Sequence, residues 1–300
     1  MLRSKIRKAV IPAAGHGTRF LPVTKVVPKE MLPIAGKPLI QFAVEEAAAS
    51  GLETVILVLG RGKRLLADYF QENPRLEEFL TKRGRTQEVE ELRRLSRLIE
   101  IRTVWQDSAL GLAHAIGCAQ SQIEDEAFAV ILPDALIDSA VPCVRQLMDC
   151  YDRHPGCIVA TRQVDDSEVE RFGILEGVPV SDPRGRVLGV HSLIERPDPR
   201  RVASRHGIFG RYILNPQIFE CIDQLKPGFG GELQLTDALM GCSHSTPVYG
   251  YCFEGTHYDA GDKTGFLEAT LHFALRDPVL SGRLSRNLPP LDTPALAVRS

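Results

Sequence analysis

The stretch KAVIPAAGHGTR stands at residues 8–19, near the start of the given sequence. Its apolar residues 9–13 lead directly into glycines, which is typical of a buried strand that enters a loop. The small side chains of that loop allow backbone N–H groups to approach a phosphate or a base edge closely. The loop is neither a Walker loop, which requires G-K-[ST], nor the full G-x-G-x-x-G fingerprint. It therefore predicts phosphate binding of another kind, with a solvated basic turn as the alternative.

Strand and helix patterns alternate along the chain beyond this loop. Pro38 suits the first turn of a helix and Gly51 its end, so we expect a helix at 38–50. Further strands are expected at 54–59, 99–105 and 127–132, and further helices at 63–71, 75–98 and 112–121. This alternation implies βαβ units and a mainly parallel sheet.

The pattern becomes mixed after about residue 142. Strands are expected at 157–161, 187–194 and 207–214, and helices at 144–152, 216–225, 233–240 and 263–275. No clean linker separates the two parts, so we expect a single domain over residues 1–279 with halves that meet near residue 140. The prolines within residues 280–300 indicate a loose C-terminal tail.

The composition argues against several classes of protein. Of the 300 residues 44% are hydrophobic and 25% charged, as in an ordinary globular protein. A formal net charge of −2 gives no overall basic field, which argues against a nucleic-acid partner. No apolar run approaches the roughly 20 residues that a membrane span needs, and the first apolar run is too short for a signal peptide. We expect a cytoplasmic protein with no membrane partner.

The seven cysteines are scattered and show no C-x-x-C spacing. An odd number without the spacing of metal ligands argues against a disulfide framework and against a zinc site. We expect reduced and mostly buried thiols.

Two positive charges follow the glycines at defined positions. Arg19 ends the loop, and Lys29 stands in the segment PKEMLP at residues 28–33. Fixed cations on opposite sides of a polyphosphate would hold it and offset its charge.

Residues 8–38 resemble the signature of the bacterial UTP–glucose-1-phosphate uridylyltransferases, within the sugar nucleotidyltransferase family. The Lys-Glu-Met form at 29–31 is similar to that group, whereas thymidylyltransferases of the same superfamily typically have K-Q-L-L-P there. The similarity extends in patches to about residue 275. It implies a Rossmann-like αβα sandwich with a mixed, mainly parallel central sheet. Its nucleotide-binding half would be residues 1–140, and its sugar-binding half residues 141–279.

The same resemblance implies a reaction in which UTP and glucose 1-phosphate give UDP-glucose and pyrophosphate, with Mg²⁺ as the cofactor. The sugar phosphate would attack the α-phosphorus in line, so no serine or cysteine nucleophile is needed. A homodimer or homotetramer is expected by resemblance. The charged helix at 75–98 is either a contact surface or a solvated face.

The nucleotide end of the implied site has three parts. Arg19 would hold the β- and γ-phosphates, and Lys29 would bind the phosphates that react. Gln106 would read the pyrimidine edge, because an amide offers both a donor and an acceptor to an imide. We interpret His114 as a helix-packing residue. The implied nucleotide-binding residues are Ala13, Ala14, Gly15, Gly17, Thr18, Gln106 and Gly111.

Asp134 follows the apolar strand at 127–132. Ligand sites in open α/β sheets lie at the carboxyl ends of strands, and a carboxylate there can hold Mg²⁺ against phosphate oxygens. By resemblance Asp134 is the principal metal ligand and Asp259 the second, with a turn or a helix cap as the alternative for each. Many members carry another aspartate after the first, where this chain has Ala135.

The sugar end would use Gly173, Glu195 and Arg196. By resemblance Glu195 accepts hydrogen bonds from sugar hydroxyls, and Arg196 contacts the sugar phosphate where most relatives have lysine. Arginine keeps the charge but replaces a compact donor by a planar fork.

Three alternatives remain open at this point. The same chemistry could use dTTP, CTP or another sugar 1-phosphate. A non-catalytic regulator that binds a sugar nucleotide is disfavoured, because such proteins tend to lose the Thr18 and Arg19 that this chain keeps. An unrelated nucleotide-binding or oxidoreductase protein is disfavoured, because the full dinucleotide fingerprint is missing.

Overall fold

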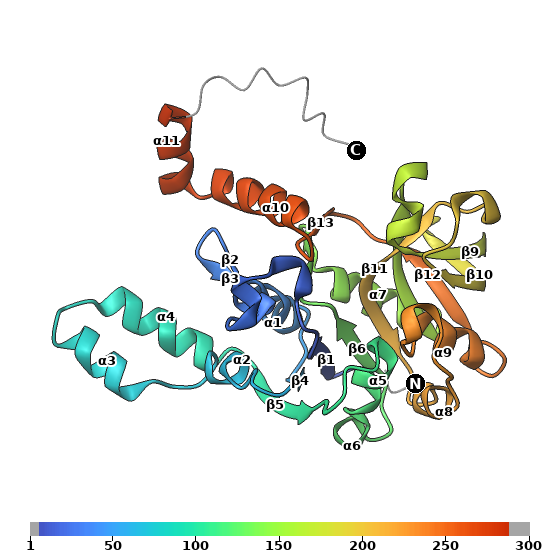
Figure 1. Cartoon of the computed structure of the whole chain (residues 1–300), viewed down its shortest axis with the longest axis horizontal. Helices are drawn as coiled ribbons and strands as arrows, with labels where there is room; N and C mark the ends of the chain where they lie inside the picture. The colour runs from blue at the N-terminus through green and yellow to red at the C-terminus, as the bar shows by residue number, and fades with distance from the viewer. Residues whose placement is uncertain (1–5, 288–300) are drawn as a thin grey trace.

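The computed structural model describes residues 6–287, which Figure 1 shows as one layered α/β body. Within that range nine strands form one sheet in the order β5-β4-β1-β6-β11-β8-β12-β10-β9. Strands β10 and β11 pair antiparallel with every neighbour, so the other seven strands share one direction. The expected mixed, mainly parallel sheet is therefore confirmed. The strands are β1 Lys8–Ala13, β4 Thr54–Leu59, β5 Glu100–Trp105, β6 Phe128–Ile131, β8 Cys157–Gln163, β9 Gly173–Pro179, β10 Val187–Glu195, β11 His206–Leu214 and β12 Val248–Cys252.

Strand β1 explains why the sheet is covered on both faces. Ile11 faces one hydrophobic cluster and Val10 faces the other, as the two-residue period of a strand requires. Both side chains are fully buried, and each such burial stabilises the fold by about 1.5–3 kcal/mol. The helices that cover the first face are α1 Leu39–Ala49, α2 Leu65–Asp68, α4 Thr86–Ser96 and α7 Cys143–Tyr151. Those on the second face are α5 Leu112–Gly117, α6 Gln120–Ile123, α8 Ile218–Asp223 and α9 Leu235–Cys242.

A smaller cluster attaches the C-terminal helices to this body. Leu136 and Ala269 are buried in it together with Leu39 at the start of α1. Figure 1 shows α10 and α11 running on from β13 at one side of the molecule. The remaining elements are β2 Pro33–Ile34, β3 Lys37–Pro38, α3 Pro74–Thr81, β7 Ala135–Asp138, β13 Thr256–Asp259, α10 Lys263–Arg276 and α11 Pro278–Asn287.

The expected single helix at 75–98 is wrong, because the segment forms the two helices α3 and α4. Gly84 adopts a left-handed φ of 69° in the turn between them. The N–H groups of Gly84 and Arg85 bond back to the carbonyls of Thr81 and Leu80, which ends α3. A glycine commonly ends a helix in this way. The sequence did not indicate the break, because the charged, periodic pattern continues on both sides of Gly84.

The expectation that the cysteines are reduced is wrong for two of them. Cys221 on α8 and Cys242 on α9 form a disulfide, with Cα atoms 6.0 Å apart. That distance falls in the range that a disulfide spans, and it follows from the packing of α8 against α9, which sequence spacing does not reveal. The free cysteines in the described part of the chain are Cys118, Cys143, Cys150, Cys157 and Cys252.

The expected loose tail begins inside a helix, because residues 280–287 belong to α11. Residues 288–300 lie outside the described part, and the division into two halves stays a prediction. Within residues 6–287 no helix is long and apolar enough to cross a bilayer.

Candidate active site

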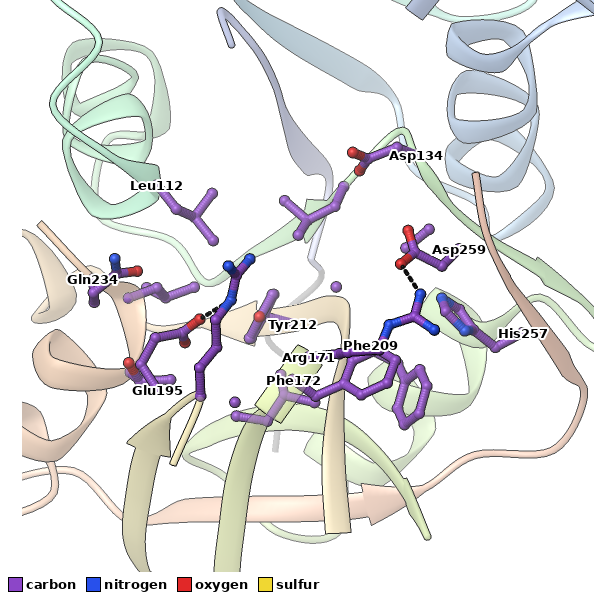
Figure 2. Close-up of a pocket in the computed structure, with 18 of the residues that line it drawn as sticks. Leu112, Asp134, Arg171, Phe172, Glu195, Phe209, Tyr212, Gln234, His257 and Asp259 are labelled. Atoms are coloured by element: carbon purple, nitrogen blue, oxygen red, sulfur yellow. Dashed lines mark hydrogen bonds and ion pairs between the residues drawn. The ribbon is translucent and has the colours of Figure 1, made fainter. Parts of the chain in front are cut away.

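A cavity of about 530 Å³ lies where several strands of the sheet end. Figure 2 shows Glu195 and Gln234 on one side of it and Asp134, Asp259 and His257 on the other. Six of the residues expected to form the site line this cavity, namely Arg19, Asp134, Gly173, Glu195, Arg196 and Asp259. Residues separated by up to 240 positions in the sequence are thus brought to one place by the fold.

The glycine loop forms as a tight turn at the end of β1. Gly17 has a left-handed φ of 64°, and a Cβ there would come within 3.2 Å of both Lys29 and Thr24. The hydroxyl of Thr24 donates to the carbonyl of Gly17 at 2.7 Å and fixes the turn. Thr18 and Arg19 then begin the short 3₁₀ helix Thr18–Phe20, from which Arg19 reaches the cavity. Ala13, Ala14 and Gly15 complete this loop beside the cavity without lining it.

Lys29 lies directly on Asp134, with Nζ 2.5 Å from Oδ2. Burial disfavours the charged form of each group, but the attraction between the two opposite charges is stronger. The pKa of Asp134 is therefore held below its usual value, and the pKa of Lys29 is raised. Asp134 is therefore an ionised carboxylate that already faces a cation. Lys29 reaches it from the 3₁₀ helix Lys29–Met31, which carries the Lys-Glu-Met sequence.

The two aspartates expected to bind metal converge over Gly261. A Cβ at Gly261 would come within 3.0 Å of Oδ2 of Asp134 and of Oδ1 of Asp259. Register explains the approach, because β13 pairs with β7 so that Asp259 lies opposite Ala135, the residue after Asp134. Two carboxylates at one point offer oxygen ligands of the kind that Mg²⁺ prefers, with water and phosphate oxygens to complete the shell. Among residues 6–287 no cluster of three or more potential ligands stands ready by itself.

Arg171 is a cavity residue that sequence reasoning missed. Its Nη2 lies 3.1 Å from Oδ2 of Asp259 and 2.8 Å from Oδ2 of Asp262, and Figure 2 shows it reaching toward Asp259. The ion pair places a positive charge on Asp259, as Lys29 does on Asp134. Its only signal in the sequence is its position two residues before Gly173.

His257 is a second missed residue. Burial and the charge of Arg211 lower its pKa to about 3, so the imidazole is neutral. It packs edge-on against Phe209 with ring centroids 4.6 Å apart and forms an apolar part of the cavity wall.

Gln106 and Gly111 lie together just outside the cavity lining. Gln106 is 6% exposed, and its Nε2 lies 3.3 Å from the carbonyl of Gly111 and 2.8 Å from Nδ1 of His114. His114 thus orients the amide of Gln106 in addition to its place in α5. Gly111 has a φ of 109°, and a Cβ there would come within 2.8 Å of the backbone of Leu233. Only glycine fits this turn, which leads into the cavity residue Leu112.

The other end of the cavity holds Gly173, Glu195 and Arg196. A Cβ on Gly173 would meet Oε2 of Glu195 at 3.1 Å, so glycine leaves this carboxylate uncovered. Burial and the nearby acids Asp237 and Glu232 raise the pKa of Glu195 against the opposing charge of Arg196. Arg196 has a left-handed φ of 43°, which an arginine adopts only under constraint from its surroundings. Its N–H donates to the carbonyl of Phe172, so the sheet edge imposes that conformation.

Comparison with known proteins places this site in a family. Residues 8–275 match the sequence profile of the family described as nucleotidyl transferase.

The chain belongs to the nucleotidyl transferase family. A Bacillus subtilis relative named UTP–glucose-1-phosphate uridylyltransferase is 43% identical over 280 residues, which cover 93% of this chain and 95% of the relative. A crystal structure of a UDP-glucose pyrophosphorylase complexed with UDP-glucose is 38% identical, with a TM-score of 0.82 over 91% of this chain and all of the other. A UTP-bound enzyme of the same kind from Acinetobacter baumannii is 31% identical, with a TM-score of 0.86 over 94% of this chain and 98% of the other.

Membership of this family confirms the expected fold class. It also suggests what the two neighbouring carboxylates could bind. Nucleotidyl transferases of this family generally use a divalent metal ion. The two ionisable carboxyl groups that meet at Gly261 have the donor chemistry for such an ion.

Proposed function

We propose that this nucleotidyl transferase transfers a uridylyl group from UTP to glucose 1-phosphate and forms UDP-glucose and pyrophosphate. The observation that carries the proposal is the contact of Lys29 with Asp134 beside a cavity that also receives Arg19 and Arg196. Cations and paired carboxylates around one cavity suit a reaction between two phosphorylated molecules. The names of the relatives support uridylyl as the group and glucose 1-phosphate as its acceptor.

The chemistry needs no covalent intermediate. A phosphate oxygen of glucose 1-phosphate forms a bond to the α-phosphorus of UTP, while the bond from that phosphorus to the bridging oxygen breaks and its electrons leave with pyrophosphate. Two like charges a few ångströms apart repel by several kcal/mol at an effective dielectric near 20. Lys29 and Arg196 bind the phosphates that react, and Arg19 steadies the β- and γ-phosphates that leave.

Mg²⁺ is the metal we propose, held by Asp134 and Asp259. When bound, it would neutralise phosphate charge and fix the triphosphate for in-line attack. The support is the approach of both carboxylates to Gly261 and the ionised state that Lys29 secures for Asp134. Arg171 pairs with Oδ2 of Asp259 and would share that carboxylate with the ion.

The uracil base is assigned to the turn of Gln106 and Gly111. Gln106 is buried and held by two contacts, so its amide has one fixed direction for reading a base edge. The loop of Ala13, Ala14, Gly15, Gly17 and Thr18 is assigned to the triphosphate through its backbone N–H groups.

The glucose moiety is assigned to the end of the cavity that Gly173 and Glu195 form. Glu195 accepts hydrogen bonds from sugar hydroxyls, and the missing side chain at Gly173 leaves room for the ring. The raised pKa of Glu195 comes from burial, which a bound polyol would offset by donating to the carboxylate.

A pyrophosphate-release assay tests the proposed reaction. The full chain is incubated with UTP and one of four acceptors: glucose, galactose, mannose or N-acetylglucosamine 1-phosphate. We expect release with glucose 1-phosphate above all, and its loss when EDTA removes the metal. Equal release with every acceptor, or none with glucose 1-phosphate, would reject the proposed substrate.

Two properties of the whole protein belong to the same proposal. We propose a homodimer or homotetramer, and light scattering coupled to size exclusion measures which of them forms. We also propose a cytoplasmic location, because nucleoside triphosphates are kept inside cells. Fractionation of cells that produce the protein tests that location.

A further inference from the structure

Lys63 ties together three segments beneath the glycine loop. Its Nζ donates to the carbonyl of Ala13 at 2.8 Å and to the carbonyl of Gly15 at 2.6 Å. The same nitrogen lies 2.9 Å and 3.1 Å from the two carboxylate oxygens of Glu30. Lys63 comes from the turn between β4 and α2, and Glu30 comes from the 3₁₀ helix that also carries Lys29.

The pair is buried while the loop above it is open. The side chain of Glu30 is 1% exposed and that of Lys63 is 11% exposed. Burial raises the pKa of Glu30 and lowers the pKa of Lys63, so each group depends on the other to remain charged. The ammonium group of Lys63 is occupied by the two carbonyls and by the Glu30 carboxylate, so the pair serves the loop and is not directed at a substrate.

The contacts with Ala13 and Gly15 set the direction of the loop's peptide groups. These peptide bonds are trans, so each carbonyl and the following N–H point in opposite directions. Carbonyls of Ala13 and Gly15 that point to Lys63 therefore direct the N–H groups of Ala14 and His16 away from it. An array of N–H groups turned to one side is the arrangement that binds anions.

A second contact keeps the two turns together. A Cβ on Gly60 would come within 2.9 Å of the carbonyl oxygen of Ala14, so the turn that carries Lys63 packs directly against the loop. The packing of the two turns therefore fixes the backbone position from which Lys63 reaches the loop.

We propose that Lys63, charged and anchored by Glu30, is a positioning residue that holds the backbone of residues 13–16 in the form that binds the triphosphate of the nucleotide. The inference rests on the proposed function, since it assumes that this loop receives UTP. It assigns a role to Glu30 of the Lys-Glu-Met sequence that is separate from the role of Lys29. It predicts selective loss of nucleotide binding without loss of sugar phosphate binding.

The test compares four variants of the full chain with the wild type. Lys63→Met removes the tether, Lys63→Arg keeps its charge, and the double variant Glu30→Gln with Lys63→Met removes both buried charges. Lys8→Met is the matched control, because Lys8 is a buried lysine at the opposite end of β1 that pairs with Glu126 at 2.9 Å. KM for UTP and for glucose 1-phosphate, UTP affinity by calorimetry and the melting temperature are measured for each.

We expect Lys63→Met and the double variant to raise KM and Kd for UTP by about tenfold or more, with KM for glucose 1-phosphate within about twofold of wild type. Lys63→Arg should recover most of the UTP affinity, and Lys8→Met should lower only the melting temperature. Equal changes in both KM values, or a change in melting temperature alone, would overturn the inference. If Lys63→Met does not fold, the double variant decides, because it leaves no unpaired buried charge. A wild type that fails to form UDP-glucose rejects the proposed function instead.

Discussion

The ammonium group of Lys29 lies 2.5 Å from the carboxylate of Asp134, although 105 residues separate them in the sequence. The contact joins the segment after the glycine loop to the end of strand β6. It keeps the strand-end carboxylate ionised and holds a positive charge at the edge of the cavity. The phosphate binding and the metal binding that we propose therefore depend on one pair of residues.

Replacing Lys29 should affect turnover far more than folding. Lys29→Met removes one of the cations that offset the repulsion of the reacting phosphates, so kcat should fall by about 10²–10³-fold. About four-fifths of each side chain is buried, and Lys29→Met leaves the Asp134 carboxylate without this partner, so the free energy of unfolding should fall by about 1–3 kcal/mol, which leaves the chain folded. Steady-state kinetics and denaturant unfolding measure the two effects. Lys82→Met, at an exposed ion pair with Glu78 at the C-terminal end of α3, serves as the control and should change neither. Near-normal turnover of Lys29→Met would contradict its assignment.

The carboxylate pair should control metal affinity directly. Asp134→Asn and Asp259→Asn each remove one charged oxygen ligand, so Mn²⁺ binding measured by calorimetry or by electron paramagnetic resonance should weaken by about tenfold or more. Asp149→Asn, on the surface helix α7, should leave the affinity unchanged. Unaltered Mn²⁺ binding in both site variants would show that the metal ion binds at another place.

Arg196 should determine affinity for the sugar phosphate and not for the nucleotide. Arg196→Ala removes a charge at the sugar end of the cavity, so KM for glucose 1-phosphate should rise by about 10–100-fold while KM for UTP stays within about twofold. Arg196→Lys keeps the charge and should recover most of that loss, because a lysine ammonium group also pairs with a phosphate. Separate titration of the two substrates distinguishes these outcomes. A rise in KM for UTP alone would show that Arg196 contacts the nucleotide and not the sugar phosphate.

Acid should destabilise the fold through His206. Burial lowers the pKa of this imidazole in the folded protein, whereas in the unfolded chain it titrates near about 6.5. Below that pH the unfolded chain takes up a proton that the folded protein does not. The stability that neutral His206 contributes is therefore complete above about pH 6.5 and falls with decreasing pH, by at most about 1.4 kcal/mol per pH unit. This loss adds to the one through His257, whose pKa is lowered to about 3. Urea unfolding from pH 7.5 to 5.0 measures the slope, which should flatten in His206→Gln. Exposed His191 replaced by Gln should leave the slope as it is in the wild type.

Elements with strong, continuous signals were predictable from the sequence. The run of apolar residues in β4 gave the strand its full bounds, because every residue of Thr54–Leu59 is buried between two helix layers. Strand β9 was missed because Gly173, Gly177 and Pro179 weaken the pattern, and β12 because Gly250 interrupts its short run. Pairing with neighbouring strands stabilises both, and that information is not local.

Some residues of the candidate site could also be predicted from the sequence, and others could not. Asp134 and Gly17 were predictable, because a carboxylate after a buried strand and a glycine turn are marked by their neighbours in the chain. Lys63 was not singled out, because nothing near residue 63 shows that its ammonium group lies under Ala13. Arg171 was missed for the same reason, since its partner Asp259 is 88 residues away.

Competition among nucleotides tests whether this site transfers a uridylyl group to glucose 1-phosphate. The full chain is given glucose 1-phosphate, Mg²⁺ and equal amounts of UTP, dTTP and CTP, and the sugar nucleotides formed are identified by mass spectrometry. We predict that UDP-glucose forms first and dominates the products. A product that is mainly dTDP-glucose or CDP-glucose, or no sugar nucleotide at all, would rule out uridylyl transfer as the reaction of this site.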